Sequence, residues 1–202
     1  VFTSYLFDSL VGQDVQGIGV PALARAWRAS ADAMTWELEL DPRARWHDGT
    51  PVTAADVLFT MDYMRQHPYP FGAVDGIVSV RASGGRRLHI GLARPDAGFV
   101  RNVLMTAPML PRHIYAGQTS PLRFSTLQAA TGSGPYRLAK YDKAQGRYLL
   151  ESNPGYYLGT PRYARIVIAR MGPEAAIEGI RRGDVDVLTD LPFELVTRAR
   201  RS

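Results

Sequence analysis

The sequence contains no cysteine and almost no lysine. Without cysteine, the chain has no disulfide, no thiolate nucleophile and no cysteine-ligated metal site. Lysine occurs only as Lys140 and Lys143, so arginine supplies nearly all of the 24 basic residues, and the net charge is +5. The arginines are scattered along the chain, whereas a nucleic-acid interface needs a basic face with interleaved aromatics. Binding to nucleic acid is therefore not expected.

Long hydrophobic runs are also missing. No apolar stretch approaches the roughly 20 residues that cross a bilayer as a helix. With 46% hydrophobic and 21% charged residues, the composition is typical of a folded soluble protein. A length of 202 residues is enough for one large domain or two modest ones.

Period-two alternation of hydrophobic residues predicts several strands. The segment "TWELEL" (35–40) alternates apolar with polar residues and predicts a strand with one buried face. Two β-rich runs, 76–82 and 87–93, flank "SGGR" and predict a hairpin. The runs 134–141 and 147–152 flank "DKAQG" and predict a second hairpin.

Helical spacing of apolar residues predicts a helix over 53–66. Thr53 stands three residues before Asp56, which is the pattern of a capping box, and Pro68 follows the last apolar position. The segment "AGFVRNVLM" (97–105) is a candidate for a shorter helix. The first half of the chain is thus predicted to be a mixed α/β unit rich in antiparallel strands.

The C-terminal part predicts a strand, a helix and a further strand. "YARIVIAR" (163–170) is apolar enough to predict a strand buried on both faces. The next helix should begin near Pro173 and end at Gly183, and "DVDVL" (184–188) should form the following strand. A strand, a crossover helix and a strand imply a parallel pair.

His47 and Asp48 stand side by side in "RWHDGTP", which raises the possibility of an imidazole held by a carboxylate. A hydrolase would also need a nucleophile, but no G-x-S-x-G motif occurs, and Ser133 in "TGSGPY" has different spacing. The four histidines lie far apart, without the spacing of metal ligands. Asp-Gly followed by Pro51 is typical of a turn that leads into a helix. We therefore expect a structural role, with no catalytic residue and no metal.

Several segments, taken together and in order, resemble the family 5 extracellular solute-binding proteins, the peptide, nickel and related receptors of ABC importers. The longest is "VPALARAWRASADAMTWELELDPRARWHDGTPVTAADVLFTMDYM", from Val20 to Met64, which resembles the signature region of that family. Four later segments also resemble landmarks of that family, in the same order. They are "ARPDAGFVRNVLMTAPMLPRHIY", "GSGPYRLAKY", "ESNPGYYLGTPRYARIVI" and "EAAIEGIRRGDVDVL".

The resemblance implies an α/β fold with mixed sheets, of the type II periplasmic-binding-protein kind, and a smaller inserted α+β domain. That inserted domain is expected at 12–113, with 1–11 and 114–202 belonging to the first lobe. The prolines between Pro108 and Pro111 mark the expected exit. Members of the family begin before the helix that "FTSYLFDSLV" resembles and continue into a second lobe. We therefore expect this chain to be a piece of a longer protein.

The resemblance also implies a function without a chemical step. The protein is expected to bind peptides or a similar solute in the periplasm, or outside the cell on a membrane tether. It would deliver the solute to ABC permease subunits, as a monomer and without a cofactor. A ligand-sensing module of a regulator is an alternative, since the fold is also used for regulation. A hydrolase that uses His47 and Asp48 is less favoured.

Weak candidates for ligand contact are Tyr69, Phe71, Met105 and Thr106. Tyr69 and Phe71 sit in a short loop broken by prolines, and loops on rigid scaffolds often carry recognition. The resemblance implies that both segments approach the cleft. The alternative for the aromatics is that they cover the end of the predicted 53–66 helix. Met105 has the spacing of a core residue, because it lies next to Leu104 in a helical pattern.

Overall fold

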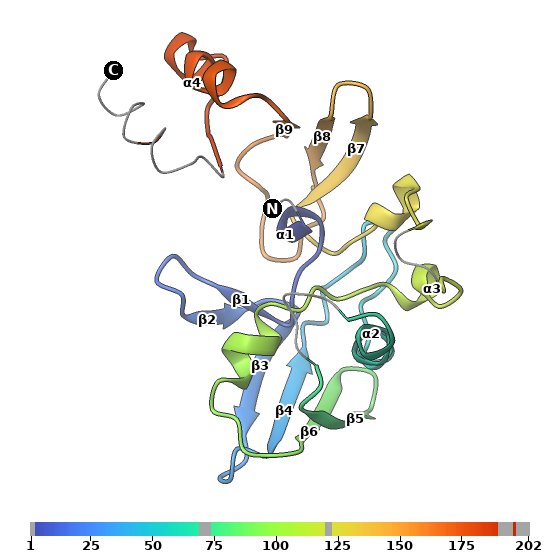
Figure 1. The fold of residues 1–202 in the computed structure, drawn as a ribbon. Helices are drawn as coiled ribbons and strands as arrows, with labels where there is room; N and C mark the ends of the chain where they lie inside the picture. The colour runs from blue at the N-terminus through green and yellow to red at the C-terminus, as the bar shows by residue number, and fades with distance from the viewer. Residues whose placement is uncertain (1–2, 69–73, 120–122, 190–195, 197–202) are drawn as a thin grey trace. The chain divides into compact units, whose positions relative to one another are not determined.

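The computed structural model describes residues 3–68, 74–119, 123–189 and 196 (Figure 1). The contacts divide the chain into two compact units. The first comprises Val1–Ala139 and Leu150–Ile166, and the second comprises Lys140–Leu149 and Val167–Ser202. Among the described residues, no helix has both the length and the apolar character needed to span a bilayer.

A four-stranded antiparallel sheet forms the centre of the first unit. Its strand order is β3-β4-β6-β5, and a separate two-stranded sheet pairs β1 with β2. The predicted strand at 35–40 and the predicted hairpin at 76–93 are confirmed. The strands are β1 (Val11–Gln13), β2 (Gly19–Pro21), β3 (Ala24–Ala29), β4 (Thr35–Leu40), β5 (Ile77–Ser83) and β6 (Arg87–Leu92).

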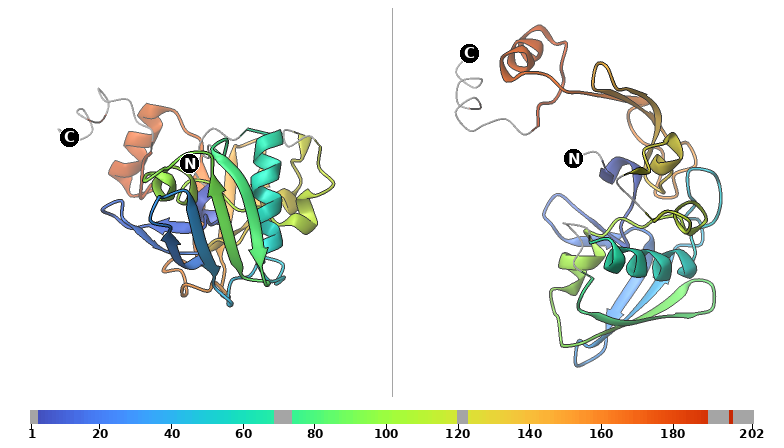
Figure 2. Two further views of the ribbon diagram at one scale, coloured as in Figure 1. Left: turned by 90° about the horizontal axis from the view of Figure 1, so that it is seen from below. Right: turned by 45° about the vertical axis from the view of Figure 1, so that its right-hand side comes forward.

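One face of this sheet is buried and the other is open to solvent. The alternation in β4 places Trp36, Leu38 and Leu40 in the core, while Glu37 and Glu39 lie on the other face. Helix α2 (Ala54–Gln66) packs beside the sheet, against β5, as Figures 1 and 2 show. The apolar positions of α2 that predicted the helix join the same core, namely Val57, Met61 and Met64, with Leu58 partly buried against it.

The start of α2 is held by a carboxylate. Thr53 is the N-cap and forms the predicted capping box with Asp56. One oxygen of Asp56, Oδ2, accepts hydrogen bonds from the amide and the hydroxyl of Thr53, both at 2.8 Å. The other oxygen accepts the amide of Arg112 at 3.0 Å. Asp56 therefore joins the start of α2 to the start of the short helix α3 (Arg112–Tyr115).

Replacing Thr53 with alanine should lower the free energy of unfolding by about 1 kcal/mol, the usual loss for an N-cap residue. Gly49→Val, in the turn that precedes α2, should cost more, because Gly49 has φ +89 and a β-branched residue is strained there. Urea denaturation followed by tryptophan fluorescence measures both effects. Because neither residue is expected to touch ligand, a large loss of solute affinity in a fully folded Thr53→Ala protein would contradict this assignment.

The remaining helices of the first unit are short. The predicted helix at 97–105 is present as a single π-helical turn, η1 (Val100–Leu104), with Val103 and Leu104 buried. Among the described residues, α1 (Thr3–Leu6) and the 3₁₀ turn η3 (Leu127–Ala130) are also short.

A three-stranded sheet of order β7-β8-β9 and the helix α4 complete the described structure. The predicted hairpin of β7 (Tyr136–Asp142) and β8 (Arg147–Ser152) is confirmed, and β9 (Arg165–Ala169) is a strand as predicted. Helix α4 (Pro173–Arg182) also follows the prediction, since it has Pro173 in its first turn and ends at Gly183, which has φ +75.

Two expectations for this part of the chain are wrong. Strand β9 is not buried on both faces, because the Val167 side chain is 53% exposed. The strand lies at one edge of its sheet, with β8 its only neighbour among the described strands, and burial on both faces needs a layer on each.

The residues 184–188 are not a strand. The amides of Asp184 and Val185 both donate to the carbonyl of Gly179, at 2.8 and 3.2 Å, so they complete the end of α4. The described residues therefore do not form the predicted parallel pair of 163–170 with 184–188.

The expected inserted domain at 12–113 stays a prediction. The strands from 19 to 92 and those from 136 to 169 lie in different sheets. The division found by contacts falls at other positions, close to Ala139, Leu150 and Ile166.

Candidate functional site

The loop that contains His47 and Asp48 is a tight turn, as its Asp-Gly pair predicts. The amide of Gly49 donates to the carbonyl of Trp46 at 2.9 Å. The Oδ1 atom of Asp48 accepts the amide and the hydroxyl of Thr50, at 3.0 and 2.7 Å. Arg45 and Pro51 pair across the turn as an isolated β-bridge.

The imidazole of His47 joins this turn to a second loop. Its Nδ1 accepts the amide of Gly132 at 3.1 Å, and its Nε2 lies 3.1 Å from the carbonyl of Gly134. Since Nδ1 accepts a hydrogen bond, it carries no hydrogen, and since a carbonyl oxygen can only accept a hydrogen bond, Nε2 must be the donor. The ring is therefore neutral. Burial lowers the pKa of His47 and favours this form. With both nitrogens occupied by backbone, His47 is a structural residue rather than a base or metal ligand.

Asp48 is paired with a different histidine, which the sequence did not indicate. Its Oδ2 lies 2.5 Å from Nε2 of His113, at the start of α3. Burial raises the pKa of Asp48, but the amide of Thr50 and the His113 side chain outweigh it and hold the pKa below its usual value. The adjacent His47 and Asp48 therefore do not form an acid–base pair.

The described residues show no nucleophile or metal set. Ser133 is fully buried, and its hydroxyl oxygen accepts the amide of Asp8 at 3.2 Å. No cluster of three or more histidine, aspartate or glutamate side chains that could hold a metal occurs in the part of the chain that the structure describes. Ser133 and His47 are therefore held in structural hydrogen bonds rather than arranged as a nucleophile and its base.

Asp8 lies next to the loop at 132–134, since its amide donates to Ser133. The sequence did not indicate a role for its carboxylate. Its two oxygens accept the hydroxyls of Tyr156 and Tyr157, at 3.1 and 3.0 Å. Its backbone carbonyl accepts the amide of Met109 at 3.0 Å. Burial raises the pKa of Asp8 to about 7, against the two tyrosine hydrogen bonds, which lower it. No motif could have indicated this group, because its partners lie about 150 residues away in sequence.

Two of the four predicted ligand-binding residues can be located. Tyr69 and Phe71 lie outside the described residues. Met105 follows η1 and is half-buried against the core of the first unit. Thr106 is exposed, and its hydroxyl donates to the carbonyl of Asn102 at 2.8 Å. Their role in binding stays a prediction.

Comparison with known proteins decides the family. A family model described as "Bacterial extracellular solute-binding proteins, family 5 Middle" matches residues 19–201. The chain belongs to this family. The resemblance inferred from the landmark segments is therefore confirmed.

The family 5 relatives agree in sequence and in fold. The "Probable D,D-dipeptide-binding periplasmic protein DdpA" of Escherichia coli is 28% identical over 185 residues, which are 90% of this chain and 35% of that one. The ABC transporter substrate-binding protein CtaP of Listeria monocytogenes is 27% identical with a TM-score of 0.76, covering 90% of this chain and 38% of that one. The oligopeptide-binding protein AppA of Bacillus subtilis, solved with a nonapeptide, is 22% identical with a TM-score of 0.80, covering 90% and 37%.

These likenesses confirm the expected fold class, a mixed α/β structure of the type II periplasmic-binding-protein kind. The chain spans about a third of the length of the relatives that it matches. Family 5 is a family of solute-binding proteins, not of enzymes, which agrees with the structural roles of His47, Asp48 and Ser133.

Proposed function

We propose that this chain is part of the substrate-binding component of an ABC importer. It would help to bind a peptide or a similar small solute and deliver it to the membrane permease subunits, in the periplasm or outside the cell on a membrane tether. The observation that carries the proposal is the family match over residues 19–201. The relative from Escherichia coli is named for D,D-dipeptides, and the structure of AppA holds a nonapeptide, so peptides are the first solutes to test.

The hydrogen bonding of the chain supports binding without catalysis. His47, Asp48 and Asp8, three groups capable of acid–base chemistry, are each engaged by partners from distant segments. Such groups hold loops in place, which suits a receptor that must present a shaped surface. We further propose that the receptor acts as a monomer and without a cofactor.

Within this proposal, the ligand-facing surface includes the loop of Tyr69 and Phe71 and the segment of Met105 and Thr106. Thr106 is exposed and keeps acceptor capacity on its hydroxyl oxygen, so it suits a polar contact with a peptide backbone. Met105, being packed on the core, should contribute by positioning Thr106 rather than by direct contact.

Tyr69→Ala and Phe71→Ala should each weaken peptide binding by about tenfold, because a truncated aromatic anchor loses at least about 1.4 kcal/mol. The measurement is calorimetric titration of the full-length gene product with D-alanyl-D-alanine and with a nonapeptide. Tyr163→Ala is the matched control, since Tyr163 is an aromatic of the same unit that is 62% exposed. If both loop variants keep the dissociation constant of the natural protein, this loop is not part of the site.

A further inference from the structure

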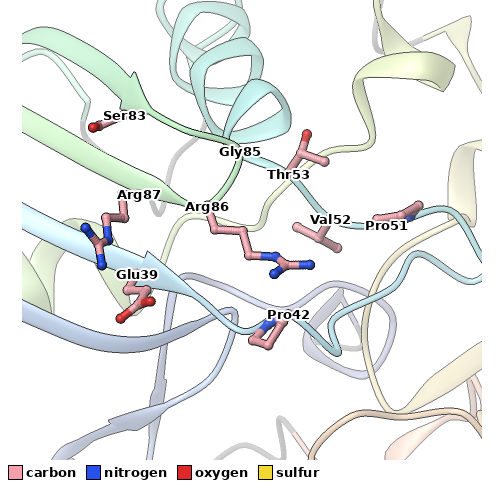
Figure 3. A pocket seen from close by; sticks show the side chains of 9 residues that line it. All are labelled: Glu39, Pro42, Pro51, Val52, Thr53, Ser83, Gly85, Arg86 and Arg87. Atoms are coloured by element: carbon pink, nitrogen blue, oxygen red, sulfur yellow. The ribbon is translucent and has the colours of Figure 1, made fainter.

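A cavity of about 550 Å³ opens where the β5–β6 turn meets the end of β4 and the segment that leads into α2 (Figure 3). It lies wholly within the first unit. Neither Met105 nor Thr106, the predicted ligand-binding residues that the structure describes, lines it. It lies beside the β5–β6 turn and the start of α2.

The lining of this cavity carries an excess of positive charge. Arg86 and Arg87 both line it, and Glu39 is the single carboxylate there. Glu39 already accepts a hydrogen bond from Nη2 of Arg25 at 2.7 Å. The pKa of Glu39 is lowered mainly by this hydrogen bond and to a smaller extent by the charge of Arg87. Among the described residues, neither Arg86 nor Arg87 has a side-chain hydrogen bond or ion pair. Two guanidinium groups therefore share this cavity with one carboxylate, which lies opposite Arg87 in the sheet and is already paired with Arg25.

The backbone that carries the two arginines is fixed on both sides. The carbonyl of Arg86 accepts the amide of Leu40, at the end of β4, at 2.8 Å. The carbonyl of Gly85 accepts the amide of Ala54, in the first turn of α2, at 3.1 Å. Gly84 adopts φ +73, which allows the tight turn between β5 and β6. The cavity wall is therefore built before any ligand arrives, which reduces the entropy lost on binding.

The rest of the lining is apolar or neutral. In Figure 3, the side chain of Arg86 extends between Pro42 and Val52, while Arg87 lies on the side of Glu39. Pro51 and Val52 add apolar surface, and Ser83 adds a hydroxyl on the other side. Charged donors beside apolar surface match an organic anion better than a bare ion.

We propose that this cavity binds an anionic group, a carboxylate or a phosphate, with the adjoining apolar part of its carrier against Pro42, Pro51 and Val52. The planar guanidinium of arginine presents paired donors that fit the two oxygens of either anion. Arg86 and Arg87 are the anion-binding residues, and Ser83 supplies a neutral donor. We base this site on its own lining residues and not on the proposed solute site.

Benzoate and inorganic phosphate are the probes, titrated into the chain at low ionic strength. We expect saturable binding of benzoate with a millimolar dissociation constant and amide chemical-shift changes in the ¹H–¹⁵N spectrum that centre on residues 83–87. Arg86→Gln combined with Arg87→Gln should weaken binding at least about tenfold, because charge-assisted hydrogen bonds are among the strongest. Both side chains are exposed, so the fold should be kept.

The matched control is Arg94→Gln, which removes the same charge beyond the other end of β6 from an exposed position. It should change benzoate binding less than about twofold, since an exposed charge that far away is screened. Equal weakening by Arg94→Gln, the absence of saturable binding, or shift changes centred elsewhere would each overturn the proposal.

Vesicles of phosphatidylglycerol, compared with phosphatidylcholine, distinguish the source of the anion. Cosedimentation with phosphatidylglycerol that is lost in the double variant, and kept in Arg94→Gln, would support a lipid head group. Benzoate binding without cosedimentation would support a small free organic anion. Cosedimentation that does not depend on Arg86 and Arg87, together with no benzoate binding, would remove the site.

Discussion

The Asp8→Asn variant should lose a pH dependence of stability that the natural chain shows between about pH 4 and pH 7. Burial raises the pKa of Asp8 from 3.8 to about 7 in the folded protein. The folded state therefore holds its proton more tightly than the unfolded state. Stability from this group is fully present below about pH 4 and is lost as the pH rises through about 7.

The size of the effect follows from the rise in the pKa of Asp8 from 3.8 to about 7. At 1.36 kcal/mol per unit, the natural chain should lose about 4 kcal/mol, in order of magnitude, relative to Asp8→Asn between pH 4 and pH 8. The comparison at each pH removes contributions from the other titrating groups, because both proteins share them. Urea denaturation can be followed by the fluorescence of the tryptophans, which all lie in the first unit with Asp8.

An unchanged difference between the two proteins across this range would show that Asp8 ionises normally in the fold. Asp14→Asn is the matched control. Asp14 lies in the exposed hairpin of β1 and β2, where its Oδ1 accepts the amides of Gln16 and Ile18. It should not reproduce the loss of pH dependence between pH 4 and pH 7.

Gly132→Ala should lower the free energy of unfolding by about 4 kcal/mol or more, in the range reached only by severe steric or packing defects. A Cβ atom at Gly132 would lie 1.8 Å from the carbonyl oxygen of Leu6. That oxygen accepts the amide of Gly134 at 2.8 Å. Because the obstacle is backbone, no side-chain rotation relieves the clash, and the contact between the 132–134 loop and the N-terminal segment must open.

The same substitution should also disturb His47, whose Nδ1 accepts the amide of Gly132. Gly117→Ala is the matched control, because a Cβ there meets no atom within 4 Å and no positive φ is required. Its effect should be within about 1 kcal/mol of zero. A Gly132→Ala protein that denatures at the same urea concentration as the natural chain would contradict the close approach seen here.

Elements that depend on near neighbours in sequence were predictable. The alternation in "TWELEL" led to β4, Thr53 with Asp56 led to the start of α2, and the Gly-Gly and "DKAQG" turns led to the two hairpins. In each case the residues that form the element also carry its signal. The strands β1, β2 and β3 were not predicted. Strand β3 has only a weak apolar alternation, since Arg25, Ala26, Arg28 and Ala29 are exposed.

The two wrong expectations share a cause. The apolar run at 163–170 indicated a strand correctly but not its burial, because burial depends on which layers cover the sheet. The apolar residues at 184–188 indicated a strand, but Val185 instead completes the end of α4 against Gly179. Local pattern cannot choose between these outcomes, since each is decided by contacts outside the segment.

The sequence by itself determined the family, the fold class and the structural nature of the turn at His47 and Asp48, because those rest on ordered motifs and on local turn and capping chemistry. Only the tertiary structure decided the partners of the polar groups. His47 forms hydrogen bonds with Gly132 and Gly134, and Asp48 pairs with His113. The carboxylate of Asp8 accepts hydrogen bonds from the hydroxyls of Tyr156 and Tyr157. These contacts join residues 65 to 149 positions apart. No periodicity or spacing encodes such pairs, because folding brings them together through packing of the whole unit.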